Sequence, residues 1–228
     1  MKLIKPKIKI TTKAYTQIKT PKILTPQIAE LIGIHFGDGC IHVRKRKSYI
    51  VTYTFNVKDN KLIEDTKSWF RELFGIELKS FVKNNGLHLY TCSKMLCYFL
   101  HENFGAPLGK KDFLSIPPII KEKDIYLKAF LRGLHRTDGC VFIKKDKKYR
   151  YPIVKITTKC YDFSIQLQKA LILFDFRATI NKKVDQRGCV GYDVTLHGTK
   201  QYQKWISEIS DKKKIKSGDT GIRTQICG

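Results

Sequence analysis

Hydrophobic and polar residues follow two different periods along this chain, and the changes between them mark its expected elements. Thr25 and Pro26 begin the first helical stretch, with Thr in the N-cap position and Pro in the first turn. Residues 49–57 are rich in β-branched and aromatic residues, which is typical of a strand. Asn84-Asn85-Gly86 indicates a tight hairpin. In the first half the pattern predicts helices over 25–37, 60–74 and 93–104, and strands over 40–47, 49–57, 76–83 and 87–92.

The same order of elements returns in the second half. The pattern there predicts helices over 124–137, 161–174 and 199–209, and strands over 139–146, 150–158, 176–184 and 189–196. The expected fold class is therefore α+β, with two tandem αββαββα halves related by a pseudo-twofold axis and built on antiparallel sheets. We divide the chain into a basic N-terminal arm (1–24), a first half (25–109), a linker (110–123), a second half (124–210) and a basic, flexible C-terminal tail (211–228).

A ten-residue sequence occurs twice, at the end of the first predicted helix of each half. LIGIHFGDGC, from Leu31 to Cys40, returns as LRGLHRTDGC, from Leu131 to Cys140, with six of the ten positions identical. Each copy ends its helix with an Asp-Gly pair, which contains Asp38 in the first copy and Asp138 in the second.

Small residues recur at every fourth position before each aspartate. They are Ala29, Gly33 and Gly37 in the first helix, and Ala129, Gly133 and Thr137 in the second. Such stripes allow two helices to approach closely. Each glycine inside a helix costs about 1 kcal/mol relative to alanine, so a packing reason is expected. If the two helices pair in parallel, Asp38 and Asp138 converge.

Two converging carboxylates at helix C-termini are electrostatically unfavourable without a cation. The helix dipole already disfavours negative charge there, and the carboxylates also repel each other. A divalent metal removes both problems, and Mg²⁺ prefers hard oxygen ligands. A single Asp-Gly is an ordinary turn sequence. The doubled copy, in register with the small residues, instead favours a metal site.

The charge of the chain indicates a polyanionic partner. Forty-four Lys and Arg residues stand against 20 Asp and Glu, a formal net charge of +24, which favours nucleic-acid binding. A thermophilic, lysine-rich composition is the alternative, but it usually brings matching glutamate. Seven cysteines without a C-x-x-C pair make zinc and a disulfide framework unexpected. No long apolar run or secretory signal occurs, so we expect a cytoplasmic, prokaryotic protein (archaeal favoured) or an organellar matrix or stromal one, neither secreted nor in a membrane.

With these features the chain resembles the LAGLIDADG homing endonucleases, in their single-chain form with two motifs. The resemblance covers residues 25–210 and includes Ser115-Ile116-Pro117 before the second motif helix. Phe36 and Arg136 stand where the family motif often has its first acid. Arg132 and Arg136 are unusual on this helix, and we expect them to face outward. The histidines at 35 and 135 are expected to be buried and hydrogen-bonded instead of acting as general bases.

The resemblance implies a monomeric, site-specific endonuclease that hydrolyses double-stranded DNA at a long, asymmetric target, in intron homing for example. Asp38 and Asp138 would bind the divalent metal, which is expected to be Mg²⁺ with Mn²⁺ as a substitute. The backbone carbonyls of Gly37 and Thr137 would assist them. Asn56 would organise water near the scissile phosphate, with Thr158 as its chosen counterpart in the second half and Lys159 as the rival.

The family also has a basic residue near the scissile phosphate. Lys110 or Lys111 fits this role in the first half, and Lys212 to Lys214 are the candidates in the second. Alternate residues of the strands would form a saddle for DNA, in which Arg recognises guanine. The expected contacts are His42, Arg44, Arg46, Tyr49, Tyr53, Lys79, Lys83, His88, Tyr90, Lys144, Lys155, Arg177, Lys183 and Arg187, with Tyr49 and Tyr53 in phase with Asn56.

Two other functions remain open for a chain of this kind. One is an RNA maturase, which would bind the RNA of a group I intron and help it fold. The other is a catalytically silent DNA-binding regulator of the same fold. A regulator can lose its acids, whereas this chain retains both; a maturase can keep them.

Overall fold

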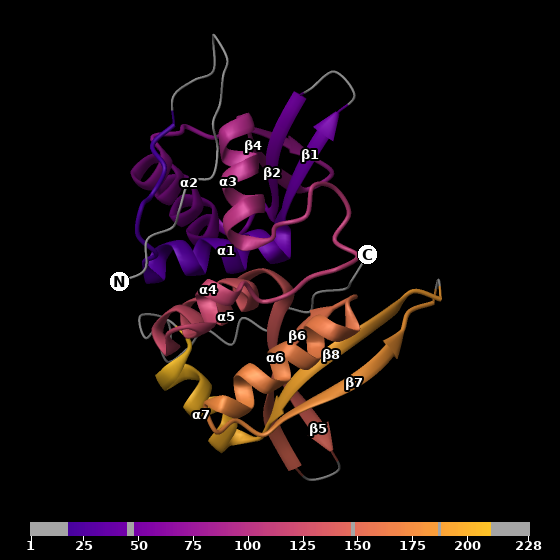
Figure 1. The fold of residues 1–228 in the computed structure, drawn as a ribbon. Helices are drawn as coiled ribbons and strands as arrows, with labels where there is room; N and C mark the ends of the chain where they lie inside the picture. Colours follow the sequence, from indigo (N-terminus) through magenta and orange to yellow (C-terminus); the bar gives the residue numbers. More distant parts are fainter. Residues whose placement is uncertain (1–17, 45–47, 147–148, 187, 211–228) are drawn as a thin grey trace.

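The computed structural model describes residues 18–44, 48–146, 149–186 and 188–210, and most of the predicted basic arm and all of the predicted tail lie outside these ranges. The described elements form two halves, which lie one above the other in Figure 1. The first half contains α1 (Pro26–Asp38), β1 (Gly39–Arg44), β2 (Ser48–Asn56), α2 (Asn60–Phe74), β3 (Lys79–Lys83), β4 (Gly86–Cys92) and α3 (Lys94–Phe104). After a short α4 (Pro118–Lys121), the second half contains α5 (Asp124–Asp138), β5 (Gly139–Asp146), β6 (Tyr149–Thr158), α6 (Tyr161–Leu173), β7 (Ala178–Val184), β8 (Val190–His197) and α7 (Thr199–Glu208).

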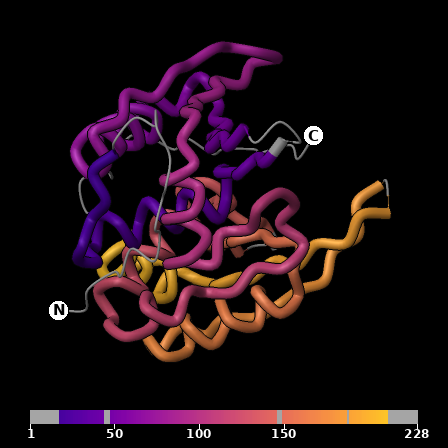
Figure 2. Tube along the Cα trace, turned by 45° about the horizontal axis from the view of Figure 1, so that its top comes forward, coloured from indigo at the N-terminus to yellow at the C-terminus, as the bar shows by residue number. Residues whose placement is uncertain are grey.

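Each half is built on one four-stranded antiparallel sheet. The strand orders are β1-β2-β4-β3 and β5-β6-β8-β7, so the two sheets have the same topology. Figure 2 shows the same division from a second direction, in which the hairpin of β7 and β8 projects away from the rest of the second half. The predicted α+β fold class is confirmed.

Local sequence signals explain where several elements begin and turn. The Thr25 hydroxyl accepts a hydrogen bond from the backbone of Ile28 at 3.3 Å, as expected for the N-cap of α1. Asn84 and Asn85 both have positive φ, at 48° and 59°, and connect β3 to β4 as a two-residue turn. Asn tolerates this left-handed conformation better than most residues, which is why the hairpin forms here.

Alternation along the strands separates a buried face of each sheet from an outer face. Along β2, Val51, Tyr53 and Phe55 are buried and join the core beneath the helices. Thr54 and Asn56 point to the opposite face and are exposed. This outer face is therefore the surface of the sheet that remains accessible to a partner.

The two halves meet along α1 and α5, which lie together in the middle of Figure 1. A Cβ at Gly33 would lie 2.8 Å from the backbone nitrogen of Leu134, and one at Gly133 would lie 3.0 Å from that of Ile34. These contacts are reciprocal and run in the same direction along both helices, so the helices pack in parallel about a pseudo-twofold axis. The small residues therefore have the packing role that their spacing predicts.

The segment between the halves is more ordered than a simple connection. Leu108 pairs with Ile41 of β1, and Ile116 is buried. Ser115 donates a hydrogen bond to Gln166 of α6 at 3.0 Å. The four residues of α4 were not predicted, because one helical turn leaves too short a pattern to detect. Among the described residues, no helix is long and apolar enough to cross a membrane.

Candidate metal centre and nucleic-acid surface

The two repeated aspartates end the two central helices and come together. α1 ends at Asp38 and α5 at Asp138, and a strand begins at the next residue in each half. A Cβ at Gly37 would lie 3.4 Å from the carboxyl carbon of Asp138 and would overlap the Thr137 side chain. Asp138 thus lies beside the C-terminal end of α1, and Gly37 provides the space that Thr137 occupies.

The Asp-Gly pairs are not turns, because each glycine already belongs to a strand. Gly39 has φ −84° and ψ 154°, and Gly139 has φ −106° and ψ 158°, which any residue can adopt. Their role is close approach, since a Cβ at either position would collide with the histidine four residues earlier. The repeated His and Gly therefore form one packing unit.

The two histidines are buried, but their surroundings differ. His35 Nδ1 lies 3.0 Å from the hydroxyl of Tyr53. His135 packs against Trp205, with ring centroids 4.8 Å apart, and its buried Nε2 has no hydrogen-bond partner. The ring of His135 is nevertheless hydrogen-bonded to the backbone of Cys140, so the prediction of buried, hydrogen-bonded histidines is confirmed for both residues. Burial lowers the pKa of His35 to about 3, with Lys111 adding to the effect, and lowers the pKa of His135 to about 4.

Burial also perturbs Asp138. It raises the pKa of this carboxyl from 3.8 to about 6, although the positive charge of Lys111 opposes the rise. The ionised form of Asp138 is therefore poorly stabilised by the protein alone. A bound cation would favour that form, because it supplies a charge next to the carboxylate.

Lys111 is the residue that brings positive charge to this centre. Its ammonium group donates to the backbone carbonyls of His35 at 3.1 Å, Phe36 at 2.9 Å and also Gly37, the last carbonyls of α1. Burial lowers the pKa of Lys111, whereas the charges of Asp138 and Asp38 oppose this. The neighbouring Lys110 is exposed. Of the two candidate lysines, the structure brings only Lys111 to the aspartates.

The donor atoms at the centre fit a hard divalent cation. Among the described residues, no group of three or more His, Cys, Asp or Glu side chains could hold a metal. The centre instead offers the carboxylates of Asp38 and Asp138 and the end-of-helix carbonyls of Gly37 and Thr137. Such an all-oxygen set with few protein carboxylates suits Mg²⁺, which usually completes its shell with water and phosphate oxygens.

Strand register identifies the counterpart of Asn56. Gly39 pairs with Tyr53 and Gly139 pairs with Ile156, so Asn56 corresponds to Lys159. Asn56 and Lys159 are both exposed. Thr158 faces the core, where it is 9% exposed and its hydroxyl accepts a hydrogen bond from the backbone of Cys160. The choice of Thr158 was therefore wrong, because one residue of shift along a strand reverses the face.

The outer face of the first sheet carries several of the predicted DNA contacts. His42 on β1, Lys79 and Lys83 on β3, and His88 and Tyr90 on β4 all share the face of Asn56. On the second sheet the same face carries Lys144, Lys155 and Lys183, while the exposed Arg177 directly precedes β7. The ammonium of Lys155 lies 3.5 Å from Asp193, which partly compensates its charge.

Two predicted contacts are on the wrong face of the sheet. Tyr53 is completely buried and contacts His35 and Phe70, so it cannot touch DNA. Tyr49 points to the same side and packs against Tyr98 of α3. Both are out of phase with Asn56, because positions that differ by an odd number lie on opposite faces. Arg46, Arg187 and Lys212 to Lys214 lie outside the described residues, as does the side chain of Arg44.

Residues 126–210 match the family model of the LAGLIDADG-like domain. A DNA polymerase of Thermococcus litoralis is 28% identical over 162 residues, which cover 68% of this chain and 9% of the polymerase. An uncharacterized protein of Methanocaldococcus jannaschii is 26% identical over 163 residues, which cover 69% of this chain and 52% of that protein. The chain thus matches about half, or far less, of these relatives' length.

Solved structures extend the LAGLIDADG comparison to both halves. I-DmoI in complex with DNA and Ca has a TM-score of 0.59 at 19% identity, covering 81% of this chain and 88% of its own. The LAGLIDADG meganuclease I-AabMI, bound to uncleaved DNA, has a TM-score of 0.53 at 15% identity, with 81% and 82% covered. The homing endonuclease I-GzeII, in complex with a DNA target, has a TM-score of 0.51 at 13% identity, and the match covers 82% of each chain. The predicted LAGLIDADG resemblance is confirmed at the level of the fold.

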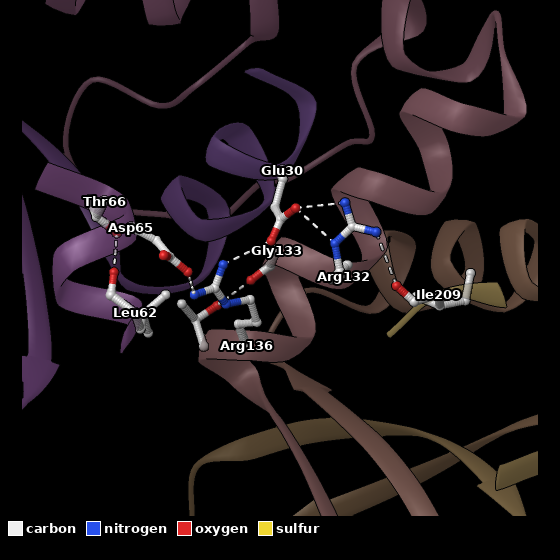
Figure 3. Close-up of polar contacts among 9 residues, drawn as sticks. Glu30, Leu62, Asp65, Thr66, Arg132, Gly133, Arg136 and Ile209 are labelled. Atoms are coloured by element: carbon white, nitrogen blue, oxygen red, sulfur yellow. Dashed lines mark hydrogen bonds and ion pairs between the residues drawn. The ribbon is translucent and has the colours of Figure 1, made fainter. Parts of the chain in front are cut away.

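Helices α1 and α5 are also joined by an ionic cluster that the sequence did not reveal. Arg132 and Arg136 of α5 do not face outward; both reach across to Glu30 of α1 (Figure 3). Arg132 lies 2.7 Å and Arg136 2.9 Å from separate oxygens of Glu30. Arg136 also lies 2.5 Å from Asp65 of α2, and Arg132 donates to the backbone carbonyl of Ile209. Glu30 is only 4% exposed, so this buried acid holds both arginines at the interface.

The available sequence signal for this cluster is a difference between the two copies of the ten-residue repeat. The second copy has Arg132 and Arg136 where the first has Ile32 and Phe36, and Glu30 is the only acid between Thr25 and Gly37. An acid in an otherwise apolar helix suggests a buried partner. Only the parallel packing of α1 and α5 shows which residues it meets.

Proposed function

We propose that this chain is a site-specific endonuclease that cleaves double-stranded DNA with the help of a divalent metal. The observation that carries the proposal is the convergence of Asp38 and Asp138 at the ends of α1 and α5, next to the half-buried Lys111. These aspartates also directly precede the strands whose outer faces carry lysine and histidine. Phosphates bound along the sheets would thus reach the aspartates at the centre.

The residues of this centre divide the proposed work among them. Asp38 and Asp138 hold the cation, assisted by the carbonyls of Gly37 and Thr137. Lys111 holds a positive charge beside the reacting phosphate, where negative charge develops. Asn56 and Lys159, at matching exposed positions, orient water or phosphate oxygens near the two strands of DNA. A bound divalent ion would make water a better nucleophile and stabilise the leaving oxygen.

The DNA contacts in this proposal come from the outer faces of both sheets. Among the residues that the structure describes, the proposed DNA contacts are His42, Lys79, Lys83, His88, Tyr90, Lys144, Lys155, Arg177 and Lys183. Because both aspartates belong to one chain, we propose that a monomer cleaves both DNA strands. The solved I-DmoI complexes with DNA and Ca, and with DNA and Mn, support a DNA target and a divalent metal. Mg²⁺ is our proposed ion, with Mn²⁺ as a substitute.

Selection from a random duplex library tests the proposal without knowledge of the natural target. The duplexes that wild-type protein cuts in Mg²⁺ are recovered and sequenced, and the best is used for kinetics. Loss of outer-shell partners of a metal typically costs about 10–100-fold, so removing a ligand with Asp38→Asn or Asp138→Asn should slow cleavage by more than about 100-fold. Binding of the same duplex in Ca²⁺ should remain, because the sheets are unchanged.

The outcomes distinguish three functions. Cleavage by wild type that both variants lose supports the endonuclease. Binding of a specific duplex without cleavage in Mg²⁺ or Mn²⁺ would instead indicate a DNA-binding regulator. If no duplex is enriched, but the protein promotes splicing of a group I intron RNA, the maturase is correct and our proposal is wrong.

A further inference from the structure

The outer face of the first sheet ends in an exposed aromatic side chain that the predicted contacts do not include. Phe81 lies in the middle of β3, the edge strand of the sheet, and is 49% exposed. Its neighbours on the same face are Lys79 and Lys83, because alternate residues of a strand point the same way. An apolar ring thus lies between two cations on the surface proposed to meet DNA.

Phe81 is part of an ordered aromatic surface. It pairs with His88 across the strands, and the two rings are stacked with centroids 4.8 Å apart and an angle of 12°. Tyr90 and Phe81 form an edge-to-face pair, with ring centroids 5.8 Å apart. His88 is also held by Thr54, whose hydroxyl lies 3.1 Å from Nδ1. The position of the Phe81 ring is therefore defined before any partner binds.

The second sheet has polar residues at the matching positions. By strand register, Phe81 corresponds to Asn181, and His88 corresponds to Asp193. Asn181 donates to Thr195 at 3.2 Å, and Thr157 donates to Asp193 at 2.7 Å. The fold alone therefore does not require an aromatic residue here. The two halves present different chemistry to whatever binds the saddle.

We propose that Phe81 recognises the 5-methyl group of a thymine in the major groove on the first-half side of the target. Of the four bases only thymine presents a methyl group there, and apolar side chains contact it. Lys79 and Lys83 fit this occupant, because they would hold the phosphates on either side of the contacted base. This inference rests on the proposed function, since it needs a double-stranded DNA partner.

Deoxyuridine tests the contact directly, because it differs from thymidine in duplex DNA only by this methyl group. Two random duplex libraries are prepared, one with thymidine and one with deoxyuridine, and selected for binding in Ca²⁺. Wild type should require thymine at one or two positions, and replacing that base with deoxyuridine should weaken binding about fourfold, the effect of burying one methyl group. Phe81→Ala should bind both duplexes equally.

Val82→Ala is the matched control. Val82 is the next residue of β3, is 64% exposed and points to the opposite face. This variant should discriminate thymine from deoxyuridine as wild type does. Asn181→Ala should also keep the discrimination, because it lies on the other sheet.

Three results would overturn the inference. One is equal discrimination by wild type and Phe81→Ala, and another is loss of discrimination by Val82→Ala as well. The third is concentration-dependent dimerisation without DNA that Phe81→Ala abolishes, since exposed edge strands also pair with one another. Failure of the libraries to enrich any sequence would overturn the proposed function itself, which these three results leave intact.

Discussion

At the scale of single residues, burial sets the protonation of the groups around the proposed metal centre. His35 and His135 are held neutral, and their pKa values fall to about 3 and about 4. Asp138 changes in the opposite direction, to about 6. The histidines therefore have no spare proton to give at neutral pH, and they are poor candidates for acid catalysis. Their repeated position in both copies follows from packing against Gly39 and Gly139.

These shifts predict a stability that falls with pH below neutrality. In the unfolded chain each histidine takes up a proton near pH 6.5, but in the folded protein neither does so until about pH 3 to 4. Between pH 7 and pH 5 each should therefore remove about 2 kcal/mol from the free energy of unfolding. Asp138 opposes this by about 1 kcal/mol, because the folded state takes up its proton over the same range. Urea denaturation as a function of pH measures the net loss.

Two variants separate the contributions to this pH dependence. His35→Gln should reduce the loss between pH 7 and pH 5 by about 2 kcal/mol, whatever its effect at pH 7. His135→Gln should reduce the loss by a similar amount, because burial lowers the pKa of His135 to about 4. Identical pH profiles for wild type and His35→Gln would contradict the assignment of the loss to a buried, neutral histidine.

At the scale of elements, most helices and strands were predictable, because each has its own periodic pattern. The structure has α2 at Asn60–Phe74, as predicted, and the other boundaries moved by only a few residues. The faces of strands were less well predicted. The assignment of Tyr53 to the outer face is an error of phase that the alternation of β2 itself corrects, because positions 53 and 56 differ by an odd number. Thr158 is a different case, because Thr157, Thr158 and Lys159 place polar residues on both faces of the chain and the pattern does not show which face is covered. Register with a neighbouring strand is needed, and register is a tertiary property.

The close packing of α1 and α5 gives a prediction for one glycine. Gly133→Ala should lower the free energy of unfolding by about 1–3 kcal/mol, although alanine is the better helix former by about 1 kcal/mol. The reason is that the new methyl group would meet the backbone of Glu30 and Ile34, which cannot move aside. Thermal or urea denaturation measures the change.

Gly37 provides a contrasting test, because its neighbour is a side chain. Gly37→Ala should also destabilise, since its Cβ would overlap Thr137. Adding Thr137→Gly should recover part of the lost stability. In a double-mutant cycle, the double variant should then be more stable than the sum of the two single effects predicts. An additive pair would mean that the two positions are not in contact.

At the scale of the whole molecule, an asymmetric ionic cluster joins elements of both halves. Glu30 of α1 accepts from both Arg132 and Arg136 of α5, and Arg136 continues to Asp65 of α2. The ring of Trp69 lies 5.7 Å from the Arg136 guanidinium carbon. Two identical halves would carry the same residues at equivalent positions. Here the positions equivalent to Arg132 and Arg136 carry Ile32 and Phe36. The cluster therefore makes the interface specific to this pair of unlike halves.

We predict that this cluster stabilises the association of the halves. Glu30→Gln should lower the free energy of unfolding by about 2–4 kcal/mol, because two largely buried guanidinium groups lose the carboxylate charge that they share. Chemical denaturation, followed by fluorescence and circular dichroism, measures this loss. The surface pair of Glu64 and Lys67 is the control, and Glu64→Gln should change stability by less than about 1 kcal/mol. Similar small effects for both variants would show that Glu30 contributes no more than a surface charge.

The sequence by itself determined the repeated order of elements, the doubled motif that contains Asp38 and Asp138, and the basic character of the chain. These properties are local or compositional: helical and strand periods, a doubled motif and an excess of lysine are all visible in one dimension. Only the tertiary structure decided that Lys111 lies at the aspartates, that Lys159 matches Asn56, and that Phe81 stacks on His88 of the neighbouring strand. The physical reason is that the place of Lys111 depends on how the segment between the halves packs against α1, and the other two facts depend on strand register. Register and helix contact depend on which residues of distant segments pack together, and no local pattern encodes that choice.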